Sequence, residues 1–523
     1  MRHGGGMAGR AARAWLAGIG LAIALGVTAP ALAQQPNRDQ DLAAMIRLWT
    51  ATLQYLEVQG LSAGLDITAA DDVKGEVVGD RLRALVPQVD VEGDTWTLTF
   101  APTSVTATPL DQDRYQITYS QAVSPTLVDG DGNPLARISI GTGRATAIWH
   151  RRESISRESK LELSDILIDG PPPSTKPGAA SAPTGQLRIA SVELIETNDP
   201  TRQAQMTLAL SGLALKDPTG TDMARIGRLT IDFASFGSVN AYAEAVVQAM
   251  ATLNWATDEP RPLGQATFEQ FEAFYQMLRG ASGRIILEDL MVPGTATTPA
   301  VTLARLEVGL EAVRDGADLR TSLTLGVTGV ASPAAVDLLP NGLFPERLQL
   351  RISLADSVLP AMGPAILREM RRAVTRLPNE VDDIYAVPNQ VITEAFTGLA
   401  DEMEQRWRVA SPRARLEQLD LVTPLGRIEV MAEASLPADA AVPATGRGEV
   451  SITNLEAMTK AAAAGGQTLG GGLLAAGLGM ATAFGKLEPD SQPPRHRIEA
   501  TVDAKGDVLV NGAPMGSVRT EKK

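Results

Sequence analysis

The chain has 523 residues, with 47 basic and 61 acidic side chains, a formal net charge of −14 and no cysteine. The negative charge argues against nucleic acid as a partner, because nucleic-acid binding needs a basic surface. The lack of cysteine excludes disulfides, so stability must come from apolar burial, and a chain of this length can form roughly two or three ordinary cores.

Residues 1–33 have the three parts of a secretory signal peptide. Three arginines form a positive segment, residues 15–27 are apolar, and Ala31-Leu32-Ala33 is a small-x-small cleavage site. The alternative is a retained anchor helix, but the apolar run is short for a spanning helix. The sequence therefore predicts cleavage before Gln34 and a periplasmic protein, with a net charge lowered from −14 to about −17 by the loss of the three arginines.

Residues 39–58 are predicted to form a helix, because apolar residues recur there at helical spacing. Beyond this helix the apolar period changes to two. The alternating sets include Trp96/Leu98/Phe100, Tyr115/Ile117/Tyr119, Ile138/Ile140, Met206/Leu208/Leu210, Leu229/Ile231/Phe233, Leu323/Leu325/Val327, Leu348/Leu350/Ile352/Leu354, Ile428/Val430 and Ile498/Ala500/Val502. Antiparallel strands with one buried face produce this pattern. The predicted fold class is β-rich α+β, with long, curved, mainly antiparallel sheets built from meander units and several packed helices.

A phrase of the form R-[IL]-x-x-[LV]-x-[IL] occurs three times within the alternating segments. The copies are Arg188-Ile-Ala-Ser-Val192-Glu-Leu194, Arg225-Ile-Gly-Arg-Leu229-Thr-Ile231 and Arg415-Leu-Glu-Gln-Leu419-Asp-Leu421. Two interpretations remain: strands resemble one another by composition, or the phrase marks a recurrent meander unit in one long sheet.

Four further helices are predicted at residues 239–254, 266–279, 364–377 and 389–405. The segment 170–186, rich in Pro, Gly, Ala and Ser, is predicted to be a linker or a long loop. It divides the mature chain into a helix-plus-β domain at 34–169 and a larger β-rich domain with inserted helices at 187–523.

The order of these features resembles a known group of proteins. The exported start, the repeated strand phrase, the late Ala/Gly-rich helix and the ending HRIEATVDAKGDVLVNGAPMG are similar to an uncharacterised family of alphaproteobacterial exported proteins. More distantly they resemble the YdgA-like and AsmA-like envelope proteins. The resemblance spans residues 40–523 as a pattern, implies a periplasmic β-rich envelope protein, and brings no functional residue with it.

The sequence contains no recognisable catalytic motif. Only His150 and His496 remain after signal removal, and neither a zinc-ligand spacing, a G-x-S-x-G elbow, an S-x-x-K pair nor a phosphate-binding loop is present. We therefore expect a protein that is not an enzyme, with no catalytic, cofactor-binding or metal-ligating residues and no cofactor.

Asp129-Gly-Asp131-Gly-Asn133 has two interpretations. Asp, Asp and Asn at alternate positions imitate the start of a calcium loop, but Pro134 and Ile140 stand where that loop needs glycine and glutamate. A tight hairpin between two strands is the other interpretation, and we favour it.

Two helical segments bear on membrane contact. In residues 364–378, Arg368, Arg372 and Arg376 line one face and could contact anionic lipid, although a solvated, internally paired face is the default.

Residues 461–485 carry no charge and include eight glycines, and Leu469, Leu473, Ala476, Met480 and Phe484 form one stripe. We expect this stripe to pack beneath the sheet; the alternative is reversible membrane contact, with Gly466 and Gly470 as a helix-pairing motif.

Two functions are compatible with these features. The first is a non-catalytic periplasmic protein that binds a lipid or another apolar ligand in a β-groove. The second is a protein–protein interaction scaffold in cell-envelope maintenance, whose sheet edges and helices bind an envelope protein partner. Peripheral membrane contact is compatible with either function, and nucleic acid with neither.

Overall fold

The computed structural model describes most of the chain after residue 37. The described residues are 38–62, 65–93, 95–119, 124–151, 155–170, 185–199, 203–236, 280–294, 299–315, 318–332, 339, 342–356, 368, 412–436, 442–464, 469–488 and 491–519. The predicted signal peptide lies outside them, and so do the helices predicted at 239–254, 266–279, 364–377 and 389–405, apart from Arg368. The chain forms two compact units, residues 1–278 and 279–523, called unit 1 and unit 2 below.

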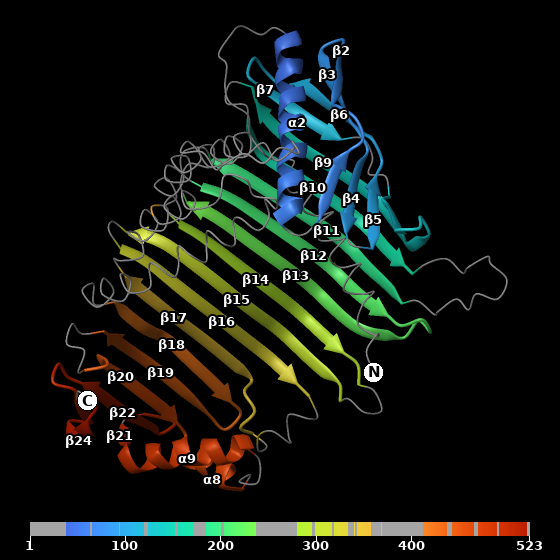
Figure 1. The fold of residues 1–523 in the computed structure, drawn as a ribbon. Coiled ribbons are helices and arrows are strands. Elements are labelled where there is room, and N and C mark those ends of the chain that lie inside the picture. The colour runs from blue at the N-terminus through green and yellow to red at the C-terminus, as the bar shows by residue number, and fades with distance from the viewer. Residues whose placement is uncertain are drawn as a thin grey trace, which may run out of the picture. The chain divides into compact units, whose positions relative to one another are not determined.

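Unit 1 contains one described helix and a branched antiparallel sheet (Figure 1). The helix α2 covers Arg38–Ser62, which confirms the predicted helix at 39–58. The strands are β1 Asp66–Ala69, β2 Lys74–Val78, β3 Arg81–Val86, β4 Val89–Gly93, β5 Trp96–Phe100, β6 Thr103–Pro109, β7 Arg114–Tyr119, β8 Thr126–Asp129, β9 Pro134–His150, β10 Ile155–Asp169, β11 Gln186–Asp199, β12 Gln203–Lys216 and β13 Asp222–Phe236.

The long strand β9 divides the first part of the sheet into two arms. Its N-terminal half pairs with β8, which continues through β5 and β4 to β1, and its C-terminal half pairs with β7, which continues through β6 and β3 to β2. Met45, Leu48 and Trp49 of α2 pack on the β7 arm, and Leu56 packs on the β8 arm. One helix therefore fills the cores of both arms.

A buried polar cluster holds α2 on the β7 arm. The Tyr115 hydroxyl donates a hydrogen bond of 2.8 Å to Oδ2 of Asp41, whose Oδ1 lies 3.4 Å from Nη1 of Arg151. Burial, followed by the bond to Asp41, raises the pKa of Tyr115 from 10.0 to about 12. The positive charge of Arg151 compensates the Asp41 carboxylate, so the helix can bury an acid among aromatic side chains.

The strands β9 to β13 form a meander, since each pairs with the next in antiparallel register. Strands β10 and β11 flank the predicted linker, of which residues 171–184 lie outside the described residues. They pair from Glu158 opposite Thr197 to Asp169 opposite Gln186. The sheet is therefore continuous across this segment, which joins two neighbouring strands, and the division into compact units falls after Leu278 instead.

The repeated phrase coincides with a slip in the side-chain alternation. Residues three apart in a regular strand point to opposite faces, yet Ile189 and Val192 are both buried in one core cluster. Next to them, Asp165 of β10 and Gly212 of β12 have positive φ angles of 52° and 63°. In the third copy, Glu417 and Gln418 form a bulge between Leu416 and Leu419. Such bulges shift the alternation by one residue without ending the strand.

Three hairpins share one turn chemistry. Asp129, Asp217 and Asp503 each end a strand or follow it directly, and each side chain accepts backbone N–H groups two and four residues further on, at 2.8–3.0 Å. The glycines three residues after these aspartates have positive φ. The hairpin predicted at 129–133 is confirmed, because β8 and β9 pair across it. The turn at Asp217 has no second acid, so this geometry needs no metal ion.

Unit 2 is a second antiparallel meander with two helices near its C-terminal end (Figure 1). Its strands are β14 Gly280–Val292, β15 Val301–Asp315, β16 Asp318–Ala331, β17 Arg347–Asp356, β18 Arg413–Thr423, β19 Gly426–Ser435, β20 Thr445–Thr453, β21 Lys486–Glu488, β22 Arg495–Val502, β23 Asp507–Val510 and β24 Ala513–Ser517. The helices α8, Leu455–Ala464, and α9, Leu469–Phe484, lie between β20 and β21. The predicted β-rich antiparallel fold class is confirmed.

The expected packing of residues 461–485 is wrong in two respects. Residues 461–464 end α8 and residues 469–484 form α9, and α9 packs on the sheet through Leu474, Leu478 and Ala481, whereas Ala476, Met480 and Phe484 of the predicted stripe are exposed. Leu478 is 2 % exposed, whereas Met480 is 61 % and Phe484 is 42 % exposed. Nearly every residue here is apolar or small, so periodicity alone does not distinguish the two sides of the helix.

We predict that Tyr115→Phe lowers the free energy of unfolding of unit 1 by about 1–2 kcal/mol, because Asp41 loses a buried hydrogen-bond donor. The raised pKa of Tyr115 favours the protonated hydroxyl in the folded protein. The hydrogen bond between Tyr115 and Asp41 therefore contributes its full stabilising free energy below pH 10.0, and this contribution is lost as the pH approaches about 12. Urea unfolding followed by tryptophan fluorescence should show the gap between wild type and variant closing over this range; a pH-independent gap contradicts the assignment.

We also predict that Leu478→Asp destabilises unit 2 by at least about 3 kcal/mol, because it places an unpaired charge in a closed core. Met480→Asp, on the exposed side of the same helix, should cost less than about 1 kcal/mol. Thermal unfolding monitored by circular dichroism checks the ranking. Equal losses in the two variants would show that both sides of α9 are packed.

Candidate ligand-binding face

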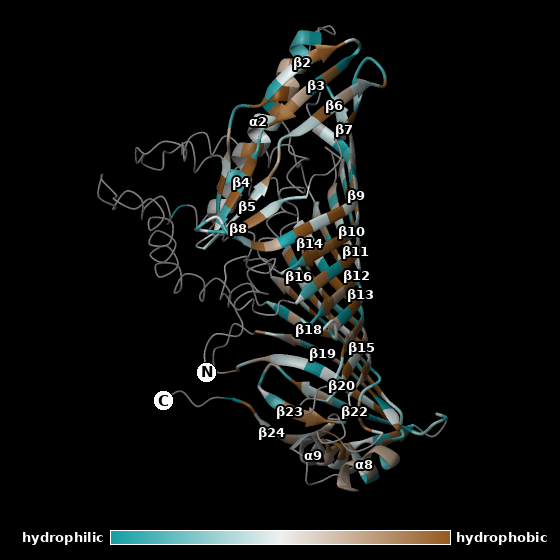
Figure 2. Cartoon of the chain, turned by 90° about the vertical axis from the view of Figure 1, so that its right-hand side faces the viewer, coloured by the Kyte–Doolittle hydropathy of each residue, from teal (hydrophilic) through white to brown (hydrophobic). Residues whose placement is uncertain are grey.

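The strands of unit 2 separate apolar and polar residues onto opposite faces of the sheet. Hydrophobic and hydrophilic residues alternate along the long strands in Figure 2. Residues that pair across neighbouring strands lie on the same face, so the pairing register shows which residues form each face.

Three cross-strand rows make up what we call the apolar face. The first row is Leu287, Leu306, Val327, Leu348, Leu421, Ile428, Ile452 and His496. The second row is Ile285, Val308, Leu325, Leu350, Leu419, Val430, Val450 and Ile498. The third row is Gly283, Leu310, Leu323, Ile352, Leu416, Ala432, Gly448 and Ala500.

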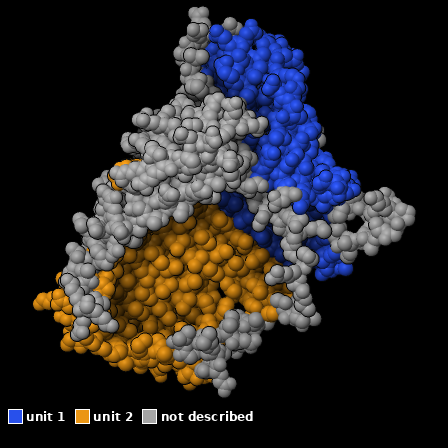
Figure 3. Space-filling model, in the orientation of Figure 1, with its two compact units in different colours: residues 1–278 blue, residues 279–523 orange. Residues whose placement is uncertain are grey.

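The part of the apolar face on β14 to β17 is accessible. Leu310, Leu323 and Ile352 are direct neighbours on three successive strands and are 63 %, 37 % and 39 % exposed, and Ile285 on β14 is 48 % exposed. Figure 3 shows that the surface of unit 2 is hollowed on the side turned to the viewer, where α9 lies in Figure 1. Single exposed leucines are ordinary, but a contiguous exposed apolar group on a hollowed surface is typical of a binding site.

The helices α8 and α9 close the other end of the same face. Leu455 and Met458 of α8 and Leu478 of α9 form a buried cluster with Ile452, and Val450 and Ile498 pack against it. Ile452 is only 4 % exposed as a result. The apolar face therefore has a covered end at β19 to β22 and an accessible end at β14 to β17.

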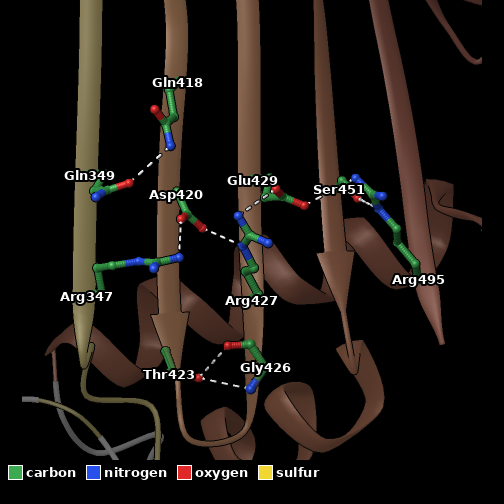
Figure 4. A network of polar contacts seen from close by, with 10 residues as sticks. All are labelled: Arg347, Gln349, Gln418, Asp420, Thr423, Gly426, Arg427, Glu429, Ser451 and Arg495. Carbon is green, nitrogen blue, oxygen red and sulfur yellow. Dashed lines mark hydrogen bonds and ion pairs between the residues drawn. The ribbon is translucent and has the colours of Figure 1, made fainter. Parts of the chain in front are cut away.

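The opposite face of the sheet is polar and its charges are paired (Figure 4). Asp420 of β18 accepts from Arg347 of β17 at 2.7 Å and from Arg427 of β19 at 2.6 Å. Glu429 lies 2.9 Å from Arg427 and 3.2 Å from Arg495 of β22. Figure 4 views these side chains with the helices behind the strands, so the network and α8–α9 lie on opposite sides of the sheet.

Asp420 is the most buried member of this network, with a side chain only 2 % exposed. Burial by itself would raise its pKa, but the hydrogen bond and charge of Arg427, followed by those of Arg347, outweigh that effect and lower the pKa below its usual value of 3.8. The network thus joins β17, β18, β19 and β22. Each of these charged side chains has at least one ion-pair partner, although Nε of Arg347 is buried without a hydrogen bond, so the network has a structural role.

The sequence predicted no catalytic or metal-ligating residue. Among the described residues, no group of three or more His, Asp or Glu side chains is placed to hold a metal ion. Within the same ranges, no helix is long and apolar enough to span a bilayer. The residues of the apolar face follow in part from the sequence, because its rows contain apolar residues of the alternating sets of β16, β17 and β19. The exposure of these residues to solvent does not follow from the sequence.

Comparison with protein-family models, curated proteins and solved structures finds no match to this chain. The resemblance to AsmA-like and YdgA-like envelope proteins therefore stays a prediction. What the protein does must be argued from its own geometry.

We predict that Asp420→Asn costs about 2 kcal/mol at neutral pH, because two charge-assisted hydrogen bonds are weakened. The folded pKa is lowered, so the contribution of Asp420 is present above pH 3.8 and is lost as the pH falls through the folded pKa. Wild type and variant should therefore converge in acid, as measured by urea unfolding. Glu433→Gln, in a more exposed pair with Arg415, is the control and should cost less than about 1 kcal/mol.

Proposed function

We propose that this protein is a non-catalytic periplasmic envelope protein that binds an acyl chain or another apolar ligand on the apolar face of unit 2. The observation that carries the proposal is the contiguous exposure of Leu310, Leu323 and Ile352 on a hollowed surface. Leaving such side chains in water costs free energy, and an apolar ligand that covers them recovers it.

The dimensions of the face suit a lipid chain. Its rows cross eight strands from β14 to β22, which at about 4.8 Å between strands gives a path of about 34 Å. A lipid chain spans half of a hydrocarbon core, or about 15 Å. The accessible part on β14 to β17 alone covers about 14 Å, so it matches one extended acyl chain.

The lining favours an apolar ligand without a specific polar group. The rows contain Leu, Val, Ile, Ala and Gly and a single ionisable side chain, His496 at the covered end. Apart from His496 at the covered end, such a surface offers contact area and no directional hydrogen bonds from its side chains, which suits ligands that share only an aliphatic chain.

We predict that Leu310→Asp weakens displacement of a bound hydrophobic fluorescent dye by long-chain fatty acid about tenfold, because a ligand must then cover a charge. Leu310 is 63 % exposed, so the fold should be retained. The matched control is Met431→Asp, which makes an equivalent change at a side chain that is 53 % exposed and lies on the polar face by alternation with Val430.

The interaction scaffold remains the other candidate, and the same experiment distinguishes it. A wild type that binds neither dye nor fatty acid, or a Leu310→Asp variant that binds as the wild type does, contradicts the ligand-binding proposal. Native mass spectrometry of protein purified from its host then reports which occupant, an apolar molecule or a protein partner, accompanies the chain.

A further inference from the structure

Helix α9 is uncharged along its whole length and only partly buried. None of its 16 residues is charged. Leu478 is buried against the sheet, while Met480 and Phe484 are 61 % and 42 % exposed, and Leu487 in the adjoining strand β21 is 56 % exposed. An apolar strip is thus left on the side of α9 that does not contact the sheet.

We infer that this strip docks on the surface of a phospholipid bilayer that contains anionic lipids. The inference rests on the proposed function and deepens it, because it names the membrane surface from which the protein would take an acyl ligand. It is supported by Lys460 in α8 and Lys486 after α9, by the length of α9 and by its place next to the apolar face.

Two lysines, one in α8 and one just after α9, complement an anionic surface. Lys460 and Lys486 bound an uncharged stretch of 25 residues, and both are exposed. Neither forms an ion pair with a carboxylate in the part of the chain that the structure describes, whereas the arginines of the polar network do. A lysine just after an apolar helix, as Lys486 follows α9, is typical of segments that lie in the interface of a membrane.

The length of α9 decides how it would meet the bilayer. Its 16 residues extend about 24 Å, and a spanning helix needs about 20 apolar residues. Many of its residues are glycine and alanine, which give little drive for full insertion. The geometry therefore points to a helix that lies along the surface, with Met480, Phe484 and Leu487 entering the boundary between headgroups and acyl chains.

The position of α9 connects this surface with the apolar face. Leu474 and Leu478 on its other side pack in the cluster that contains Ile452, together with Val450 and Ile498 of the apolar face. The helical hairpin thus contacts the apolar face on one side and presents exposed apolar residues on the other. Docking through α9 would bring the covered end of the face to the membrane.

Flotation of the purified protein with phosphatidylcholine vesicles, with and without phosphatidylglycerol, tests the inference. We expect the wild type to float with vesicles that contain phosphatidylglycerol, and the double variant Met480→Asp/Phe484→Asp to partition at least about tenfold more weakly. Lys460→Gln/Lys486→Gln should remove the dependence on phosphatidylglycerol. Met431→Asp is the matched control and should float as the wild type does, with circular dichroism confirming the fold of each variant.

The inference would be overturned by a wild type that stays in the soluble fraction, or by a Met480→Asp/Phe484→Asp variant that floats as the wild type does. It would also be overturned if this double variant lost oligomeric mass while its flotation stayed unaffected. The last outcome would show that a second copy of the chain covers the strip. Fatty-acid binding measured without vesicles separates this inference from the proposed function. Retained binding without flotation contradicts docking alone, and flotation without fatty-acid binding contradicts the proposed function alone.

Discussion

The alternation of side chains along antiparallel strands is the constraint on which the rest of this protein depends. In the regular parts of the unit 2 strands, alternate residues enter the aliphatic rows, and residues between them form ion pairs such as Arg347–Asp420–Arg427. A shift by one residue would place arginines against leucines along a whole strand. The register is therefore fixed from both faces at once, which suits a chain that has no disulfides.

The slips in alternation show how long strands keep one apolar face. Ile189 and Val192, and Leu416 and Leu419, reach the same face only because a bulge or a left-handed residue lies beside or between them. Asp165 adopts this conformation as a non-glycine residue, which aspartate tolerates better than most side chains. The repeated phrase therefore marks the place where a strand changes phase, and its spacing follows from the bulge.

Much of the fold could be predicted from the sequence, because period-two patterns and Asp-x-x-Gly turns are local signals. The helix α2 and the hairpin after Asp129 are examples. Other features depend on tertiary contacts that no short window contains. The segment at 170–186 has the composition of a linker, yet β10 and β11 on its two sides pair from Glu158 opposite Thr197 to Asp169 opposite Gln186. In α9 almost every residue is apolar or small, so the sheet decides that Leu478 is buried and Met480 is not.

Exposure, more than composition, distinguishes the candidate site from an ordinary core. In the meander of unit 1, Ile189, Val192 and Leu210 are at most 3 % exposed, although Phe233 near the end of β13 is 46 % exposed. In unit 2, Leu310 and Leu323 occupy an equivalent place in the alternation but are 63 % and 37 % exposed. The free energy that stabilises the core of unit 1 is therefore only partly realised in unit 2. Covering these exposed apolar side chains with an apolar ligand would lower the free energy, and the sequence pattern alone could not reveal that they are exposed.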